Sequence, residues 1–199
     1  MRSDVLAPGL LIAAPPLGDP NFERTVVLLA LHGPRGALGF VVNRTADLRL
    51  GQVLGLAGYG APATKSGSPV YLGGPVEPGS GWIVTREPKR LDGVPGVIEV
   101  GETLRVSSSR AAFDRFARDV EGGEEGLQNT EHDAFVVLGY SGWGPGQLES
   151  EIATGSWLPI RLDEGVVFEV DVEQRWFRAH ALLGITPLSG MGMRTVGEA

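Results

Sequence analysis

The residues best able to do chemistry in this sequence lie in one short segment, LGYSGWGPGQLESEI, at positions 138–152. It places Ser141 and Trp143 among closely spaced glycines, directly ahead of a stretch that carries Glu149 and Glu151. These residue types fit a nucleophilic serine in a strand-to-helix turn, an anion held by backbone amides, or proton transfer by carboxylates. A tight turn that does no chemistry is the fourth interpretation.

The serine does not fit a nucleophile elbow. That turn requires glycines two residues before and two residues after the serine, because its strained backbone leaves no room for side chains. Gly139 meets the first requirement, but Trp143 stands at the second position. The sequence holds three histidines, and each has an ordinary explanation as a turn, loop or helix-surface residue: His32, His132 and His180.

The glycines leave two interpretations open. A dinucleotide fingerprint would need a glycine where Gln147 stands, and no Gly-Lys pair exists to form a P-loop. Glycines at 142, 144 and 146 would still let backbone amides approach an anion at a helix start. The alternative is a plain turn, with Pro145 at the first helical position and Gly155 closing the helix.

The stretch after this turn predicts a short helix with one polar side. Leu148 and Ile152 share an apolar face. Gln147 and Glu151 stack on another face at helical spacing. Glu149 lies nearly opposite Glu151, so the two glutamates are not the facing pair that acid and base catalysis needs.

Size and composition indicate one soluble domain. A chain of 199 residues and 21.0 kDa fits a single compact unit, with 42% hydrophobic and 21% charged residues. We take residues 1–199 as one domain, with an ordered core at 8–183 and a tail at 184–199. The apolar run at 5–17 is interrupted and too short for a membrane span. A cytoplasmic protein without membrane contact is therefore expected.

Charge and cysteine content argue against several classes of partner and site. The formal net charge is −7, and the basic residues form no cluster, which disfavours direct nucleic-acid binding. Without cysteine the chain has no disulfide, no thiolate nucleophile and no cysteine-type zinc site. No metal or cofactor is expected.

Short apolar runs separated by glycine and proline predict a sheet of short strands. The expected strands are residues 10–14, 25–31, 37–42, 70–72, 81–85, 97–100, 103–106, 134–139, 157–160 and 166–170. The second and third form a hairpin, and runs that are apolar at nearly every position indicate strands covered on both faces. Further helices are expected at 47–58, 108–120 and 172–183, and loops at 61–68 and 121–133.

Four blocks of this sequence resemble the bacterial YqgE/AlgH family. They are GYSGWGPGQLESEI with the following Ser156-Trp157, LLIAAPPLGDPNFERTVVLL at 10–29, HGPRGALGFVVNR at 32–44 and VYLGGPV at 70–76. They occur in the family's order and span most of residues 8–170. The resemblance implies the fold class α/β (α+β): a single domain with a mixed, partly split β-sheet of short strands and about four helices packed on it.

What the resemblance implies about function is limited. The family takes its name from a proposed transcriptional regulator of alginate synthesis, and it is known neither for a DNA-binding motif nor for an established catalytic set or cofactor. The sequence agrees, because no helix-turn-helix with a basic recognition helix is visible.

We therefore expect a non-enzymatic binding or regulatory protein with a cleft near the helix start, which receives a small ligand or a loop of a protein partner. The expected binding residues are Arg24, Asn43, Gly74, Trp143, Gly144, Gln147 and Glu151. Several of them also have structural explanations: Asn43 as a turn cap, Arg24 as a surface ion pair with Asp19, and Gly74 as a glycine in a crowded turn.

The alternative is a hydrolase that uses Glu149 or Glu151 as a base, with His32 or Ser141 nearby. Burial discriminates between the two hypotheses. The enzyme requires one glutamate to be sheltered in a concave pocket within hydrogen-bond reach of His32 or Ser141.

Overall fold

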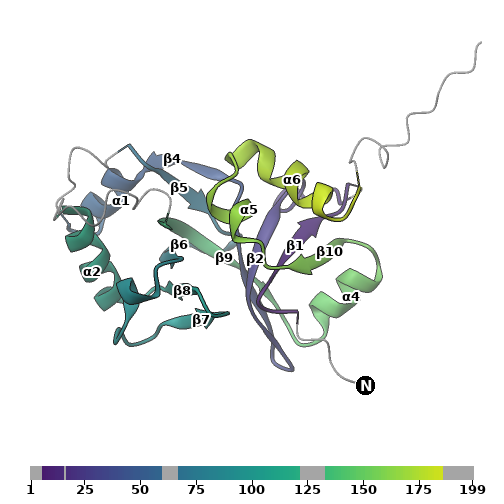
Figure 1. Ribbon diagram of the computed structural model, residues 1–199, viewed down its shortest axis with the longest axis horizontal. Coiled ribbons are helices and arrows are strands. Elements are labelled where there is room, and N and C mark those ends of the chain that lie inside the picture. Colours follow the sequence, from purple (N-terminus) through teal and green to yellow (C-terminus); the bar gives the residue numbers. More distant parts are fainter. Residues whose placement is uncertain (1–5, 16, 60–66, 122–132, 186–199) are drawn as a thin grey trace, which may run out of the picture.

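Ten strands form one open sheet in the computed structural model of this chain, which describes residues 6–15, 17–59, 67–121 and 133–185 (Figure 1). The strands are β1 (Gly9–Ala13), β2 (Val26–Gly33), β3 (Gly36–Val41), β4 (Thr45–Arg49), β5 (Pro69–Leu72), β6 (Val76–Thr85), β7 (Ile98–Val100), β8 (Leu104–Ser107), β9 (Ala134–Trp143) and β10 (Trp157–Arg161). Eight of them follow the order β10-β1-β2-β3-β9-β6-β8-β7, and β4 pairs with β5 beside this path. The pairing of β5 with β9 is parallel and the others are antiparallel, which confirms the predicted mixed sheet.

The long strand β9 divides the sheet. Its first part pairs with β6 and β5, and its last three residues pair with β3. At Gly139 the backbone takes a φ of +70°, and an added Cβ would lie 2.7 Å from the carbonyl oxygen of Gly74. Glycine therefore permits both the left-handed backbone and the close approach at the point where β9 changes partners. The predicted partial split of the sheet has this physical basis.

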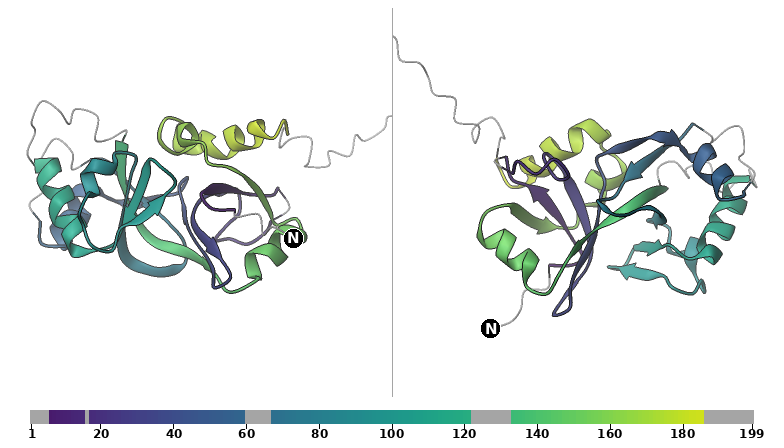
Figure 2. Two further views of the ribbon diagram at one scale, coloured as in Figure 1. Left: turned by 60° about the horizontal axis from the view of Figure 1, so that its bottom comes forward. Right: turned by 180° about the vertical axis from the view of Figure 1, so that it is seen from behind.

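Five α-helices cover the sheet within the described residues, together with two single turns of 3-10 helix. The helices are α1 (Leu50–Leu56), α2 (Arg110–Glu121), α4 (Gln147–Ala153), α5 (Glu164–Phe168) and α6 (Arg175–Leu182), and the turns are η1 (Pro88–Leu91) and η2 (Val172–Gln174). Figure 2 shows α6 lying across one side of the sheet, away from both α4 and the pair α1 and α2. The expectation of about four helices is close to this number.

Both faces of the sheet are buried, as the uninterrupted apolar runs predict. Leu10 and Ile12 of β1 pack in the cluster that contains Ala179 of α6. Leu11, from the opposite face of the same strand, packs with Leu148 of α4. A third cluster joins α1 and α2 to β5, β6 and β9.

The strongest local patterns are confirmed. The β2 and β3 strands form the predicted hairpin, closed by the pair Gly33 and Gly36. Helix α2 buries the predicted apolar stripe, and Ser109 accepts a hydrogen bond from the amide of Ala112 at its start. This serine satisfies one of the unpaired amides that every helix start leaves.

The strand predicted at 166–170 is wrong, because Glu164–Phe168 forms helix α5. Asp163 Oδ1 accepts the Val166 amide at 3.0 Å, which caps the helix. Val166, Val167 and Phe168 are all buried against neighbouring elements. Capping and burial outweigh the strand preference of the two valines.

Several boundaries also differ from the prediction; for example, β6 begins at Val76, five residues earlier than expected. The helix expected at 47–58 begins at Leu50, because residues 45–49 pair with β5 as strand β4. Strand β9 continues four residues past Gly139, so Ser141 lies inside a strand. Gly146, rather than Pro145, stands at the start of α4 and takes a left-handed φ of 73°.

Three other predictions fall mainly outside the described residues. These are the loops at 61–68 and 121–133, and most of the tail at 184–199. Across the described residues, no helix has both the length and the apolar content that crossing a membrane would require.

Candidate functional site

Along the chain, helix α4 lies between two tryptophans, one at the end of a strand and the other at the start of the next strand. Trp143 is the last residue of β9, and Trp157 is the first residue of β10. Two glycines with left-handed backbones, Gly146 before α4 and Gly155 after it, let the chain turn sharply at both ends of the helix. The two indoles consequently meet, with ring centroids 5.8 Å apart and planes at 79°.

The carboxylate of Glu151 joins these indoles. Trp143 Nε1 donates to Glu151 Oε2 at 2.9 Å, and Trp157 Nε1 donates to the same oxygen at 2.8 Å. Hydrogen bonds to a carboxylate are stronger than those between neutral groups. Trp143 is 6% exposed and Trp157 2%, so their indole N–H groups need such a partner inside the protein.

Gln147 completes the cluster one helical turn earlier. Its Nε2 donates to Glu151 Oε1 at 2.9 Å, and its Oε1 accepts the backbone amide of Gly144 at 3.0 Å. The predicted stacking of Gln147 and Glu151 is therefore a direct contact. Since Gln147 already occupies the Gly144 amide, that amide is not open to an anion.

A cavity of about 260 Å³ lies in front of this cluster. Its walls include Trp143, Trp157 and Glu151, and its far side is formed by Phe22 and Asp19 from the loop after β1. The ring of Phe22 stacks on Trp143 with centroids 6.2 Å apart and meets Trp157 edge-on at 5.3 Å. Three aromatic rings and two carboxylates thus share one small hollow.

The charge of this hollow is negative. Asp19 and Glu151 line it, and no lysine or arginine does so among the described residues. Asp19 is exposed and Glu151 half-buried, so a ligand can reach both. Aromatic faces and carboxylates both attract cations, and they disfavour anions.

The loop that carries Asp19 and Phe22 is held by Arg44. Its guanidinium donates to the carbonyl oxygens of Pro20, Asn21 and Glu23 at 2.8, 3.0 and 2.9 Å. A planar guanidinium is suited to such a set of acceptors, because its donors point in fixed directions. Arg44 therefore positions one wall of the cavity without lining it.

The structure divides the seven predicted binding residues into two groups. Trp143, Gln147 and Glu151 line the same cavity, and the Gly144 amide contacts Gln147. The other three, Arg24, Asn43 and Gly74, do not line this cavity.

Arg24 and Asn43 contact each other through the backbone. Asn43 Nδ2 donates to the Arg24 carbonyl at 2.8 Å, and Asn43 Oδ1 accepts the Val26 amide at 2.8 Å. Asn43 therefore has a structural role, but it holds the start of β2, far away in the sequence, instead of capping a local turn as predicted. The Arg24 guanidinium lies over the ring of Trp176, 5.7 Å from its centroid, and forms no ion pair with Asp19.

Gly74 is a position of close backbone packing. Its φ is +148°, and an added Cβ would overlap the carbonyl oxygen of Tyr140 and the hydroxyl oxygen of Ser141. It borders a separate hollow of about 150 Å³, together with Leu72 and Arg44. A side chain at this position would push β9 away.

The residues of the hydrolase alternative are only partly assembled. His32 Nε2 lies 3.0 Å from Glu149 Oε1, and Leu6 donates its amide to His32 Nδ1, which places the proton of the neutral ring on Nε2. Two contacts hold the pKa of the Glu149 carboxyl below its usual range. The larger effect comes from the backbone amide of Glu149 and the smaller one from His32. The Glu149 side chain is, however, 52% exposed.

Ser141 does not join that pair. It is fully buried and donates its hydroxyl to the Gly73 carbonyl at 3.0 Å. Glu151 is more sheltered than Glu149, but its oxygens bind Trp143, Trp157 and Gln147 instead of His32 or Ser141. Neither glutamate combines shelter with a contact to His32 or Ser141, which is the arrangement that the alternative requires.

Two residues that line the cavity, Phe22 and Trp157, are not among the binding residues predicted from the sequence. Trp157 is nearly buried, and its contact with Glu151 depends on the turn at Gly155, which no helical spacing reveals. Phe22 follows Asp19 in a polar loop, and this composition was the available signal. An aromatic residue in a polar loop often packs on another segment.

Comparison with known proteins gives consistent matches over nearly the whole chain. The sequence pattern of the AlgH-like family matches residues 10–188. A UPF0301 protein of Anaeromyxobacter sp. (strain Fw109-5) is 40% identical over 189 residues, covering 92% of this chain and 90% of that protein.

Two solved structures have a similar fold. The solution structure of the AlgH protein from Pseudomonas aeruginosa matches with a TM-score of 0.74 and 31% identity, over 100% of this chain and 98% of that one. A crystal structure of a Corynebacterium diphtheriae protein matches with a TM-score of 0.62 and 23% identity, over 90% and 94% of the two chains. The second match bears on the fold alone.

Proposed function

This chain belongs to the AlgH-like family, as its four sequence blocks predict, and on that premise we propose that it is a non-enzymatic binding protein for a small ligand with a positively charged group. The ligand's cation enters the cavity beside Glu151. The observation that carries the proposal is the composition of this cavity: three aromatic rings and two carboxylates, with no basic side chain among the described residues.

The physical reason is the attraction of a cation to aromatic faces and carboxylates together. Each cation–π contact contributes about 0.5–2 kcal/mol, depending on how far the site is desolvated. Glu151 stays fixed by its three hydrogen bonds, so little side-chain entropy is lost when a ligand binds. A neutral ligand of the same shape would gain neither attraction.

The size of the cavity selects the part of the ligand that enters. Sites for whole drug-sized molecules have volumes of about 300–1,000 Å³, and this cavity, at about 260 Å³, is smaller. It suits one ammonium or guanidinium group with a short stem. A free amine and an amino group on a peptide share this chemistry.

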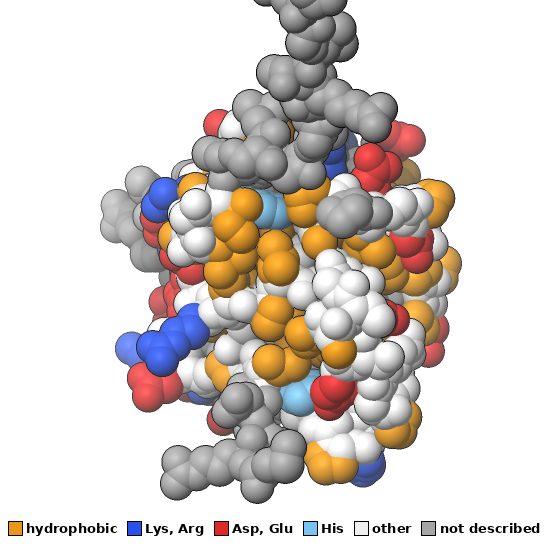
Figure 3. Space-filling view, turned by 90° about the vertical axis from the view of Figure 1, so that its right-hand side faces the viewer, with side chains coloured by type: hydrophobic (Ala, Val, Ile, Leu, Met, Phe, Trp, Pro, Cys, Tyr) orange, Lys and Arg blue, Asp and Glu red, His pale blue; other side chains and the backbone are white. Residues whose placement is uncertain are grey.

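We propose that any regulatory role acts through this ligand, in the cytoplasm and without direct nucleic-acid contact. The net charge of −7 supports this part of the proposal. The face shown in Figure 3 carries hydrophobic side chains along its middle and basic side chains only at its margins. Proteins that bind a phosphate backbone instead gather basic side chains in a patch or stripe on one face.

The test is an NMR titration that follows the indole N–H resonances of Trp143 and Trp157. Butylammonium chloride and butylguanidinium chloride are added to the full chain, with 1-butanol, sodium butyrate and sodium chloride as matched controls. We expect saturable shifts with the two cations, at roughly millimolar Kd, because few weak contacts are involved. Equal shifts with butanol or butyrate would refute the proposal.

A pair of variants separates the cavity from general charge effects. Asp19→Asn removes a carboxylate that lines the cavity but keeps an acceptor for the Asn21 amide. Glu23→Gln removes the same charge from the same loop, outside the cavity. Cation binding should weaken in the first variant and stay near the wild-type value in the second; an equal loss in both would count against a specific site.

A further inference from the structure

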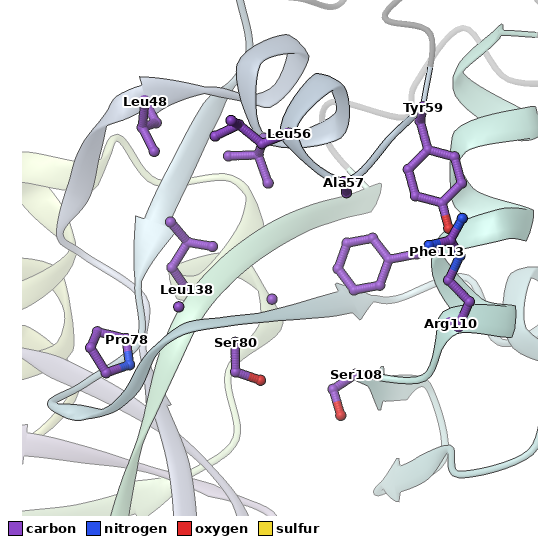
Figure 4. A pocket seen from close by; sticks show the side chains of 13 residues that line it. Leu48, Leu56, Ala57, Tyr59, Pro78, Ser80, Ser108, Arg110, Phe113 and Leu138 are labelled. Atoms are coloured by element: carbon purple, nitrogen blue, oxygen red, sulfur yellow. The ribbon is translucent and has the colours of Figure 1, made fainter.

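A second cavity, of about 520 Å³, lies in the other half of the molecule, between α1, the start of α2 and strand β6 (Figure 4). It shares no lining residue with the cavity beside Glu151. Its volume falls within the range of sites that hold whole small molecules, about 300–1,000 Å³. The cation-binding proposal does not use it.

The walls of this second cavity are mainly apolar. Leu48 and Leu56 form one side, Phe113 faces them from α2, and Leu138 of β9 lies below the two leucines in this view (Figure 4). Leu56 is 81% exposed and Leu48 36%, so this apolar side of the cavity is open to solvent. Apolar surface gathered around a hollow marks a binding site more strongly than scattered exposed leucines do.

Two glycines of β6 line this cavity and leave it open because they carry no side chain. At Gly81 an added Cβ would lie 2.9 Å from the Phe113 ring, so the missing side chain lets the ring lie against β6. At Gly79 no atom lies within 4 Å of an added Cβ, and the backbone φ is not in the left-handed region. Position 79 therefore accepts a side chain that would occupy the hollow.

One end of the cavity is polar and basic. Arg110 Nε donates to Asp114 at 3.0 Å, and its guanidinium lies 4.8 Å from the centroid of the Tyr59 ring. These contacts fix the side chain beside Tyr59 and Asp114, and its guanidinium also interacts with the Tyr59 hydroxyl. The hydroxyls of Ser80 and Ser108 border the same end and bind no other described residue. No acidic side chain among the described residues lines the cavity.

From this arrangement we infer a second binding site, for an amphipathic carboxylate whose apolar body lies among Leu48, Leu56 and Phe113 and whose carboxylate meets Arg110. The two terminal nitrogens of a guanidinium match a carboxylate geometrically. The side chain of Arg110 is 71% exposed, so water screens this contact. Most of the affinity therefore comes from the apolar body, and Arg110 gives the preference for an acid.

The test compares three probes of equal chain length with the full chain: octanoate, 1-octanol and octylammonium. Titrations are followed by the backbone amide resonances of residues 79–81 and 110–113. Octanoate should bind most tightly at these residues, and each CH₂ added between hexanoate and decanoate should tighten binding by roughly fourfold until the cavity is full. Shifts confined to other residues, or equal affinity for octanoate and octanol, would overturn the inference.

Two variants test the two ends of the site. Gly79→Leu places a side chain in the hollow and should abolish octanoate binding while butylammonium binding at the other cavity stays unchanged. Arg110→Gln should reduce the preference for octanoate over octanol by severalfold, whereas Arg118→Gln, an exposed arginine of the same helix outside the cavity, should not. Undiminished octanoate binding by folded Gly79→Leu, or an unchanged preference in Arg110→Gln, would contradict the site.

Discussion

Trp157 donates its indole N–H to the carboxylate of Glu151 at 2.8 Å, and the two residues lie on opposite sides of the turn that ends α4. The same oxygen also accepts the N–H of Trp143. Glu151 is thus a structural acceptor that holds together the two strands flanking its helix. It also gives the cavity a fixed negative charge, so one side chain serves both the fold and the proposed site.

The structural role predicts a large stability loss in Glu151→Ala. Two buried indole N–H groups would lose their acceptor, and an unsatisfied buried donor costs about 1–3 kcal/mol. We expect a total loss of about 2–5 kcal/mol in the free energy of unfolding, measured with urea. Glu151→Gln retains one oxygen for the indoles and should lose less.

Glu149→Ala is the matched control on the same helix. Its carboxylate is half exposed and contacts His32, and exposed ion pairs contribute about 0–1 kcal/mol. If Glu149→Ala were as destabilising as Glu151→Ala, the indole cluster would not be the source of the effect.

Close packing at Gly74 predicts a second stability difference. In Gly74→Ala the new Cβ overlaps β9 at Tyr140 and Ser141, and the backbone φ of +148° disfavours any side chain. The free energy of unfolding should fall by about 1–3 kcal/mol. Gly79→Ala, which meets nothing within 4 Å, should change it by less than about 0.5 kcal/mol. Equal effects of the two substitutions would show that Gly74 is not crowded.

Arg44 is predicted to act on the cation site from outside it. Arg44→Lys keeps the charge but cannot reproduce hydrogen bonds to three carbonyl oxygens. We expect faster hydrogen exchange in residues 17–24 and butylammonium binding weakened by severalfold, because one cavity wall is no longer held. Arg178→Lys, an exposed position on α6, should change neither measurement. Normal exchange with wild-type binding in Arg44→Lys would remove its positioning role.

The sequence predicted those parts of the fold that local patterns determine. The β2–β3 hairpin was predicted from the short glycine-containing connection between its strands, which in the structure is only residues 34–35. Helix α2 was predicted from its apolar stripe and serine cap. The contact of Gln147 with Glu151 follows from their spacing of four residues on one helix. In each case the partners are close in sequence.

The parts that could not be predicted depend on contacts distant in sequence. Phe22 contacts Trp143 although 121 residues separate them, and Arg44, a third distant residue, binds the loop that carries Phe22. The Val166–Phe168 segment is helical because Asp163 caps it and the core receives all three side chains, whereas its valines alone favour a strand. The cavity over Gly79 combines α1, α2 and β6, which no single pattern brings together.

The Tyr59–Asp114–Arg110 cluster at the second cavity predicts a pH-dependent part of the stability. The Tyr59 hydroxyl and the Arg110 guanidinium both donate hydrogen bonds to the Asp114 carboxylate. These bonds hold the pKa of the Asp114 carboxyl below its usual value, and Tyr59 has the larger effect. A carboxyl with a lowered folded-state pKa binds fewer protons in the folded than in the unfolded protein, so its contribution is present above the unfolded-state pKa of about 3.9. That contribution is lost as the pH falls through the folded-state pKa.

Urea unfolding of the wild type and Asp114→Asn between about pH 2 and pH 7 measures this contribution. The wild type should be the more stable at neutral pH. The difference should start to shrink below about pH 4, where the carboxyl of the unfolded chain takes up a proton, and should vanish once the folded protein's carboxyl is protonated too. Asp92→Asn is the control, because the Asp92 carboxylate makes no hydrogen bond or ion pair with another described residue, and its difference from the wild type should not follow this course. A difference for Asp114→Asn that stayed constant over the whole range would mean that its hydrogen bonds do not favour the ionised form.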